Sequence, residues 1–129
     1  MISTSAFDYI NVLDKAADAS WTRETLIANN IANADTPGYK RQDIDFQTAL
    51  RNEISRYKYI SLDRKMRDVD LTELNPEVYT DSANYSYRLD GNNVDIDTEQ
   101  VELASEQIKY QALTTSITSE FERLRAVIK

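Results

Sequence analysis

The chain has 129 residues, a formal net charge of −7, and neither cysteine nor histidine. These absences exclude disulfides and thiol chemistry and remove the commonest general base and metal ligand. The acidic balance argues against a general nucleic-acid or anionic-membrane binder, and the length fits one domain-sized unit.

The first predicted element is a helix over residues 5–33. Its apolar side chains recur at steps of three, four or seven residues, which is typical of an amphipathic helix. Trp21 and Leu26 lie off the centre of this stripe and indicate a second contact surface, while Ser20 and Glu24 interrupt it. The expected packing positions of this helix are Phe7, Ile10, Leu13, Ala17, Ile27 and Ile31.

A sharp turn follows the helix at Thr36-Pro37-Gly38-Tyr39. Proline presets φ at the second position of a turn, and glycine supplies the positive φ that a type II turn requires at the third. The chain should therefore leave the helix abruptly and continue in an extended conformation through residues 40–46.

The middle of the chain, residues 34–96 including the turn, is predicted to be irregular and partly β or flexible. Phe46, Leu50 and Ile54 recur every four residues and predict a short helix. Residues 78–80 and 85–87 have the composition of short strands. Basic residues interleaved with tyrosines over 51–67 are compatible with nucleic-acid binding, but acids dilute the pattern. A solvated, flexible connector is the favoured interpretation.

The last predicted element is a helix over residues 97–129. A turn at 90–93 and a short extended piece at 94–96 precede it, and Asp97 with Gln100 has the spacing of a capping box. Apolar residues then recur about every 3.5 residues, as coiled coils require. The expected packing positions are Leu103, Tyr110, Leu113, Ile117, Phe121, Leu124 and Ile128.

These elements predict a mainly α fold in which residues 1–129 form one unit with paired, coiled-coil-like terminal helices. The two helices should span about 43 Å and about 48 Å at 1.5 Å per residue. A single pair leaves much of each apolar face uncovered, so the burial of apolar surface favours further copies or partners. In a free monomer such helices can be frayed and can fold on assembly.

The end of the first helix and the turn after it carry a specific motif. The stretch 26–40 resembles the N-terminal signature of bacterial flagellar axial proteins, the rod and hook family. Residues 41–46, 91–97 and 109–113 are similar to the proximal member of the rod family, and a FlgC-like rod protein is the nearest alternative. Residues 55–85 take no part in the resemblance. The signature positions are Leu26, Ile27, Asn29, Asn30, Ile31, Asn33, Thr36, Pro37, Gly38 and Tyr39.

The resemblance implies a structural subunit of the flagellar basal-body rod, the drive shaft that joins motor to hook and surrounds the export channel. It implies as partners further copies of the chain, rod proteins of the FlgC, FlgF and FlgG types, the FliE adaptor and the type III export gate. It also implies a position in the periplasm. The start of the chain has no basic region followed by an apolar run, so export without a cleavable signal is expected, and no transmembrane segment is predicted.

Roles for individual residues follow from the same resemblance. Asn29, Asn30 and Asn33 are expected to bond groups of adjacent subunits, because a buried amide left unpaired is costly. An alternative, which applies to Asn33 in particular, is that these side chains cap the helix end. Phe46 and Leu50 resemble the short export-gate signal of early flagellar substrates, although one turn of core helix explains them equally well.

Enzymatic interpretations are weaker. Clustered carboxylates can bind Mg²⁺ or Ca²⁺, but none here has the spacing of a calcium loop, and no phosphate loop or nucleophile–base pair is visible. We therefore expect no enzyme activity, metal or cofactor, and interpret the acidic clusters as solvated or capping groups. A generic helical adaptor of a soluble complex and a metal-dependent hydrolase remain as alternatives. The clusters are Asp43 with Asp45, Asp68 with Asp70, and Asp95 with Asp97 and Glu99.

Overall fold

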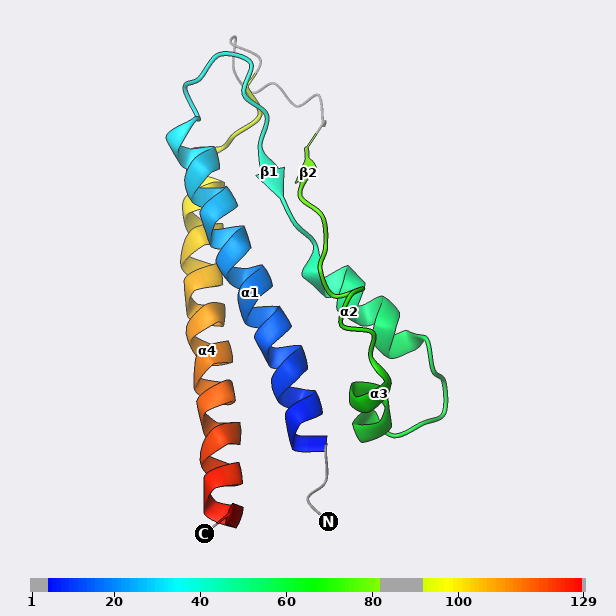
Figure 1. Cartoon of the computed structure of the whole chain (residues 1–129). Helices are drawn as coiled ribbons and strands as arrows, with labels where there is room; N and C mark the ends of the chain where they lie inside the picture. The colour runs from blue at the N-terminus through cyan, green and yellow to red at the C-terminus, as the bar shows by residue number, and fades with distance from the viewer. Residues whose placement is uncertain (1–4, 82–91, 129) are drawn as a thin grey trace.

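A computed structural model describes residues 5–81 and 92–128 of the chain. The molecule is elongated, with α1 along its middle, α4 antiparallel to α1 on one side, and α2 and α3 on the other side (Figure 1). The predicted mainly α fold with two long terminal helices is confirmed. The elements in chain order are α1 (Ser5–Ala32), β1 (Gln42–Asp43), α2 (Phe46–Ser55), α3 (Leu62–Asp68), β2 (Tyr79–Thr80) and α4 (Ile96–Ile128).

Helix α1 buries two faces, as its two apolar surfaces predict. Ala17 and Ile27 are buried beside Ser20, whose hydroxyl bonds Glu106 of α4. The other face places Leu26 in the main hydrophobic cluster, which the chain's own middle segment completes. This second surface therefore has an intramolecular partner. The buried members of the cluster are Val12, Ala19, Leu26, Ile44, Phe46, Met66 and Leu74.

The turn after α1 has the predicted geometry. Gly38 has a φ of 74°, and the amide of Tyr39 donates to the carbonyl of Thr36 at 3.1 Å, as in a type II turn. The chain then forms β1, which pairs antiparallel with β2 through Gln42 opposite Thr80. The predicted strand at 78–80 is thus confirmed at its last two residues, whereas the predicted strand at 85–87 lies outside the described residues.

The described part of the middle segment up to residue 81 is irregular between its short elements but packs against α1, so for these residues the interpretation as a solvated, flexible connector is wrong. Helix α2 begins after Asp45, which accepts a hydrogen bond from the Thr48 amide at 3.0 Å, and its prediction is confirmed. Helix α3 was not predicted because its seven residues bury only Met66 and show no apolar period. Contacts with α1 hold it, including a 2.7 Å hydrogen bond from the Tyr9 hydroxyl to Asp63.

Helix α4 begins one residue earlier than predicted, and its cap is Asp95 rather than Asp97. The Asp95 carboxylate accepts hydrogen bonds from the amides of Asp97 and Thr98 at 3.1 and 3.3 Å. Either aspartate suits a cap by type. Val94, directly before the cap, is buried.

The prediction of an apolar seam along α4 is correct in its direction, because α4 packs on α1, but wrong about which residues are buried. Among its described residues the two that are buried are Glu99 and Glu106, so charged side chains occupy the centre of the contact with α1. Most of the predicted apolar positions flank this centre and are half-buried, while Phe121 and Ile128 are exposed, as is Phe7 on α1. The half-buried positions are Leu103, Tyr110, Leu113, Ile117 and Leu124 on α4 and Leu13 on α1.

Across the described ranges, every helix is too short or too polar to cross a membrane.

We expect Leu74→Ala to lower the free energy of unfolding by about 3 kcal/mol, because it opens a cavity in the hydrophobic cluster. Urea unfolding followed by circular dichroism measures this loss. The exposed Leu62 provides the control, since Leu62→Ala should change the value by less than about 0.5 kcal/mol. An equally small loss for Leu74→Ala would show that the middle segment is not packed.

Candidate functional site

The signature residues divide into an inner and an outer set at the end of α1. Leu26 and Ile27 are buried, as packing positions should be, and Asn30 has no exposed surface. Half-buried positions are Ile31, Asn33 and Tyr39, and exposed positions are Asn29, Thr36, Pro37 and Gly38.

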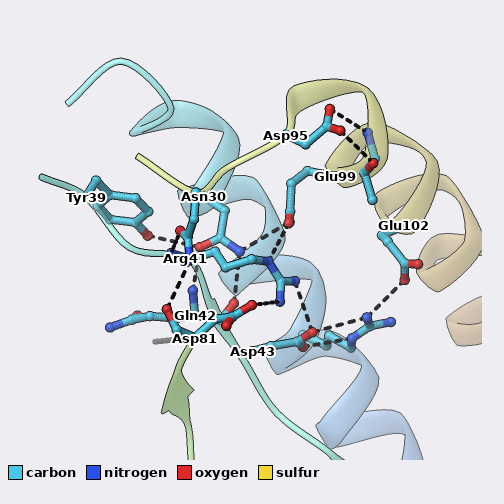
Figure 2. A network of polar contacts seen from close by, with 12 residues as sticks. Asn30, Tyr39, Arg41, Gln42, Asp43, Asp81, Asp95, Glu99 and Glu102 are labelled. Carbon is cyan, nitrogen blue, oxygen red and sulfur yellow. Dashed lines mark hydrogen bonds and ion pairs between the residues drawn. The ribbon is translucent and has the colours of Figure 1, made fainter. Parts of the chain in front are cut away.

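Asn30 bonds three segments of its own chain. Its Nδ2 donates to the carbonyl of Gln42 at 2.9 Å and to Glu99 at 3.2 Å. Its Oδ1 accepts from the amide of Gln42 at 2.9 Å and from the hydroxyl of Tyr39 at 3.0 Å (Figure 2). All four hydrogen-bonding positions of the amide are therefore satisfied within the chain, and the expected bond of Asn30 to an adjacent subunit stays a prediction.

The other two asparagines of the signature differ from Asn30. Asn33 donates to the carbonyl of Asn29 at 2.8 Å and accepts from the Thr36 hydroxyl at 3.1 Å. Through these local bonds the Asn33 side chain caps the end of α1, which agrees with the expected capping role rather than with a contact to an adjacent subunit. The side chain of Asn29 points into solvent, so its predicted contact with a neighbour stays a prediction.

Two further asparagines join the turn to the segment that leads into α4. Asn92 donates to the carbonyls of Ala34 and Thr36 at 2.7 and 2.8 Å and is fully buried. Asn93 accepts from the backbone amide of Arg41 at 2.9 Å. Within the family-like stretch, Asn92 and Asn93 thus connect the turn after α1 to the segment before α4.

Arg41 connects the first strand to α4. Its Nε donates to Glu99 at 2.7 Å, and its terminal nitrogens bond Asp43 at 3.1 Å and Asp81 at 3.5 Å. Figure 2 shows Arg41 reaching between Glu99 and Asp43. The Glu99 side chain is almost completely buried, so Arg41 supplies the counter-charge that water cannot.

Arg23 makes the matching contact from α1. Its Nε donates to Asp43 at 2.9 Å, and its terminal nitrogens donate to Glu106 at 2.8 Å and to Glu102 at 2.9 Å. Asp43 thus lies between two arginines and bonds both. We call this set of side chains the polar seam: Ser20, Arg23, Asn30, Arg41, Asp43, Glu99, Glu102 and Glu106.

The electrostatics around Asp43 and Arg23 favour the charged forms of both side chains. Burial alone would raise the pKa of Asp43, but hydrogen bonds from Arg23, from the Ile44 amide and from Arg41, with the arginine charges, outweigh it and lower the pKa. The hydrogen bond to Asp43 likewise raises the pKa of Arg23. Each buried charge is therefore compensated, and removing one partner would leave another uncompensated.

The sequence analysis did not identify the polar seam. It assigned Asp43 and Glu99 to solvation or capping, which is wrong, because both carboxylates are buried and paired with arginines. One signal was present: Ser20 interrupts the apolar stripe of α1, and its hydroxyl donates to Glu106 at 2.7 Å. Glu99 and Glu106 are seven residues apart and share a helix face with the apolar seam.

A cleft of about 410 Å³ opens beside the seam between α1, α4 and the start of α2. Its walls include Arg23, Asp43, Glu102 and Glu106, which already bond one another. No three acidic side chains in the described ranges lie together as metal ligands would. The arrangement can hold two helices in a fixed register.

Phe46 and Leu50, the expected export signal, lie together on α2. Phe46 is buried in the hydrophobic cluster and Leu50 packs against it. In the folded chain they form one turn of core helix, and an export role remains a proposal.

Comparisons with known proteins fit this geometry. A family model described as flagella basal body rod protein matches residues 25–40, which span the end of α1 and the turn. The chain is 40% identical over 119 residues to the flagellar basal body rod protein FlgB of Bacillus subtilis (strain 168), covering 92% of each chain. It is 36% and 30% identical to the FlgB proteins of Proteus mirabilis (strain HI4320) and Escherichia coli (strain K12), covering 83% of each chain.

Replacing Arg41 by methionine tests the seam. Arg41→Met should lower the free energy of unfolding by about 3–5 kcal/mol, because it leaves the buried Glu99 without a counter-charge. Arg123→Met removes an exposed pair with Glu120 and should cost at most about 1 kcal/mol. Chemical denaturation compares the two variants, and equal losses would contradict a structural role for the seam.

The low pKa of Asp43 predicts a pH dependence of stability. Its contribution should be complete above the unfolded-state value of 3.8 and should be lost as the pH falls through the lower folded-state pKa. Unfolding free energies of the wild type and Asp43→Asn, measured from pH 7 downward, should therefore differ most at neutral pH and converge in acid. A difference in unfolding free energy between wild type and Asp43→Asn that stays the same at every pH would contradict the lowered pKa of Asp43.

Proposed function

The chain belongs to the FlgB family of flagellar basal-body rod proteins and is a structural subunit of the proximal rod, and we propose that it joins the rod through the outward faces of α1 and α4. The single observation that carries this proposal is the apolar surface of α4 that its own chain leaves uncovered. Val101 and Ile108 are each 70% exposed, although they lie on a helix already packed against α1.

These two residues belong to a continuous row. With exposed Ala104 and Ala112 they follow one outward face of α4, opposite the buried Glu99. Small side chains between larger ones let another helix approach closely, and burial of apolar area contributes about 25 cal/mol per Å². Such a face is favourable for a protein that exists in an assembly.

The polar seam supports the same function by fixing the register of α4 on α1. Sliding one helix by a turn would separate Arg23 from Glu106 and Arg41 from Glu99 and leave these charges unpaired. A subunit with a fixed register presents one constant surface to its neighbours. A drive shaft needs this constancy, because it must transmit torque without its subunits rearranging.

The partners we propose are further copies of the chain, rod proteins of the FlgC, FlgF and FlgG types, the FliE adaptor and the flagellar type III export gate. We place the assembled subunit in the periplasm, around the export channel, after export from the cytoplasm without cleavage of a signal. The sequence resemblance supports these assignments. Burial of Phe46 further requires that the export gate read Phe46 and Leu50 before the chain folds.

A structural rather than enzymatic role is part of the proposal. The charged groups that line the cleft beside the seam pair with one another across helices, which supports a role in holding the helices together.

Substitution of the outward row tests the proposal in a strain that lacks this gene. The wild-type chain should restore rods and motility, whereas Val101→Asp/Ile108→Asp should restore neither, because carboxylates would be buried between subunits. Rods are observed by electron microscopy of isolated basal bodies, and motility by swimming in soft agar.

The matched control is Gln100→Asp/Gln107→Asp, which places the same charges at the same spacing on a neighbouring exposed face of α4. This control should support motility. Full motility of the Val101→Asp/Ile108→Asp strain would show that the outward row is not an assembly surface.

A further inference from the structure

Charge is unevenly distributed in this acidic chain. Residues 51–67 contain six basic and two acidic residues and so carry a net charge of +4. Because the whole chain carries −7, the remainder carries −11. One segment of each molecule is therefore attracted to the rest of another molecule.

The middle of the basic segment is a loop between α2 and α3, on the side of the molecule away from α4 (Figure 1). Tyr59 in this loop is completely exposed and has a φ of 67°, a left-handed conformation that is rare for an aromatic residue and often marks a functional position. Lys58 and Arg64 are exposed and form no ion pair within the described residues. We call the loop residues Tyr57, Lys58 and Tyr59, together with Arg64 of α3, the basic loop.

A complementary surface lies on the face of α1 that neither α4 nor the middle segment covers. Asp14 and Asp18 are exposed one turn apart, and no ion pair with another described residue offsets their repulsion. Trp21, one turn further, is 60% exposed and contacts Tyr110 of α4, with ring centroids 5.8 Å apart. We call Asp14, Asp18 and Trp21 the acidic stripe.

We propose that the basic loop of one copy binds the acidic stripe of the next copy. Lysine and arginine can pair with the two aspartates and lie against the Trp21 ring, and tyrosine, tryptophan and arginine are the residues that contribute most at protein interfaces. The inference rests on the proposed function, because it names one contact through which rod subunits join.

A second copy fits the basic loop better than nucleic acid or an anionic membrane does. Nucleic acid and an anionic membrane are negative throughout and would be repelled by the −11 on the rest of the chain, whereas a second copy carries a local +4 segment that this charge attracts. The loop of one copy binds the stripe of the next in one direction only, so the proposed contact is heterologous. Repeated contacts of this kind generate an open helical series unless the rotation between copies closes them into a ring.

A charge swap on the full chain tests the contact, with self-association measured by sedimentation velocity at about 0.02 M and about 0.5 M salt. The wild type should associate at low salt and dissociate at high salt. Lys58→Glu/Arg64→Glu and Asp14→Lys/Asp18→Lys should each weaken association at least tenfold. The variant that combines all four changes should regain it, because opposite charges meet again.

Folding and general charge effects are controlled separately. All four residues are exposed, so circular dichroism should show unchanged helix content. Glu73→Lys/Glu77→Lys, which reverses two other exposed acids, should leave association within about twofold of the wild type.

Three results would overturn the inference: a wild-type chain that stays monomeric at low salt, a combined variant that fails to regain association, or binding to anionic vesicles or nucleic acid without self-association. The proposed function is judged by a different readout. If the wild-type chain restores rods in the deletion strain but the charge swap fails, only this contact is wrong. If the wild-type chain restores no rods, the proposed function itself fails.

Discussion

Asp43 lies between two arginines, and the arrangement of the two chain ends depends on that contact. Arg23 reaches it from α1, and Arg41 reaches it from the strand that follows the turn. The same arginines bind Glu106 and Glu99, the two buried residues of α4. Buried charges of this kind give little net stability but are costly to separate, so they select one register among several that apolar contacts alone would permit.

The seam also explains why so much apolar surface remains outside. The hydrophobic cluster joins α1 to the middle segment and includes no residue of α4. Because α4 is positioned by charges, its outward row around Val101 and Ile108 is not needed for the fold of the monomer. That row is free to contact neighbouring subunits, which is what a structural subunit of a rod requires.

The elements that could be predicted from the sequence are those with a regular apolar period or a characteristic turn sequence. The span of α1, the Gly38 turn and the α2 helix all follow from local patterns, and the structure confirms them. Helix α3 has no such pattern, because a seven-residue helix with one buried side chain is held by contacts distant in sequence.

The seam could not be predicted for a related reason. Glutamates 99, 102 and 106 appear in sequence as ordinary solvated charges of an amphipathic helix. Their pairing depends on Arg23 and Arg41, which lie about sixty to eighty residues away along the chain, and two of them, Glu99 and Glu106, are buried. The Asn30 amide also bonds its own chain, and the motif alone does not distinguish this from a contact between subunits.

The account depends most on the claim that the polar seam fixes the register of α4 on α1. The chain has no cysteine, so spin labels can be attached at two introduced cysteines, Thr25→Cys on α1 and Gln107→Cys on α4, both exposed sites. Pulsed electron–electron double resonance measures the distance between the two labels. It should give one narrow distance when both arginines are present. After Arg23→Met/Arg41→Met the distance distribution should be broad or split, with positions displaced by about 5 Å for each helical turn that α4 slides along α1. The same single narrow distance in the arginine variant would contradict the account.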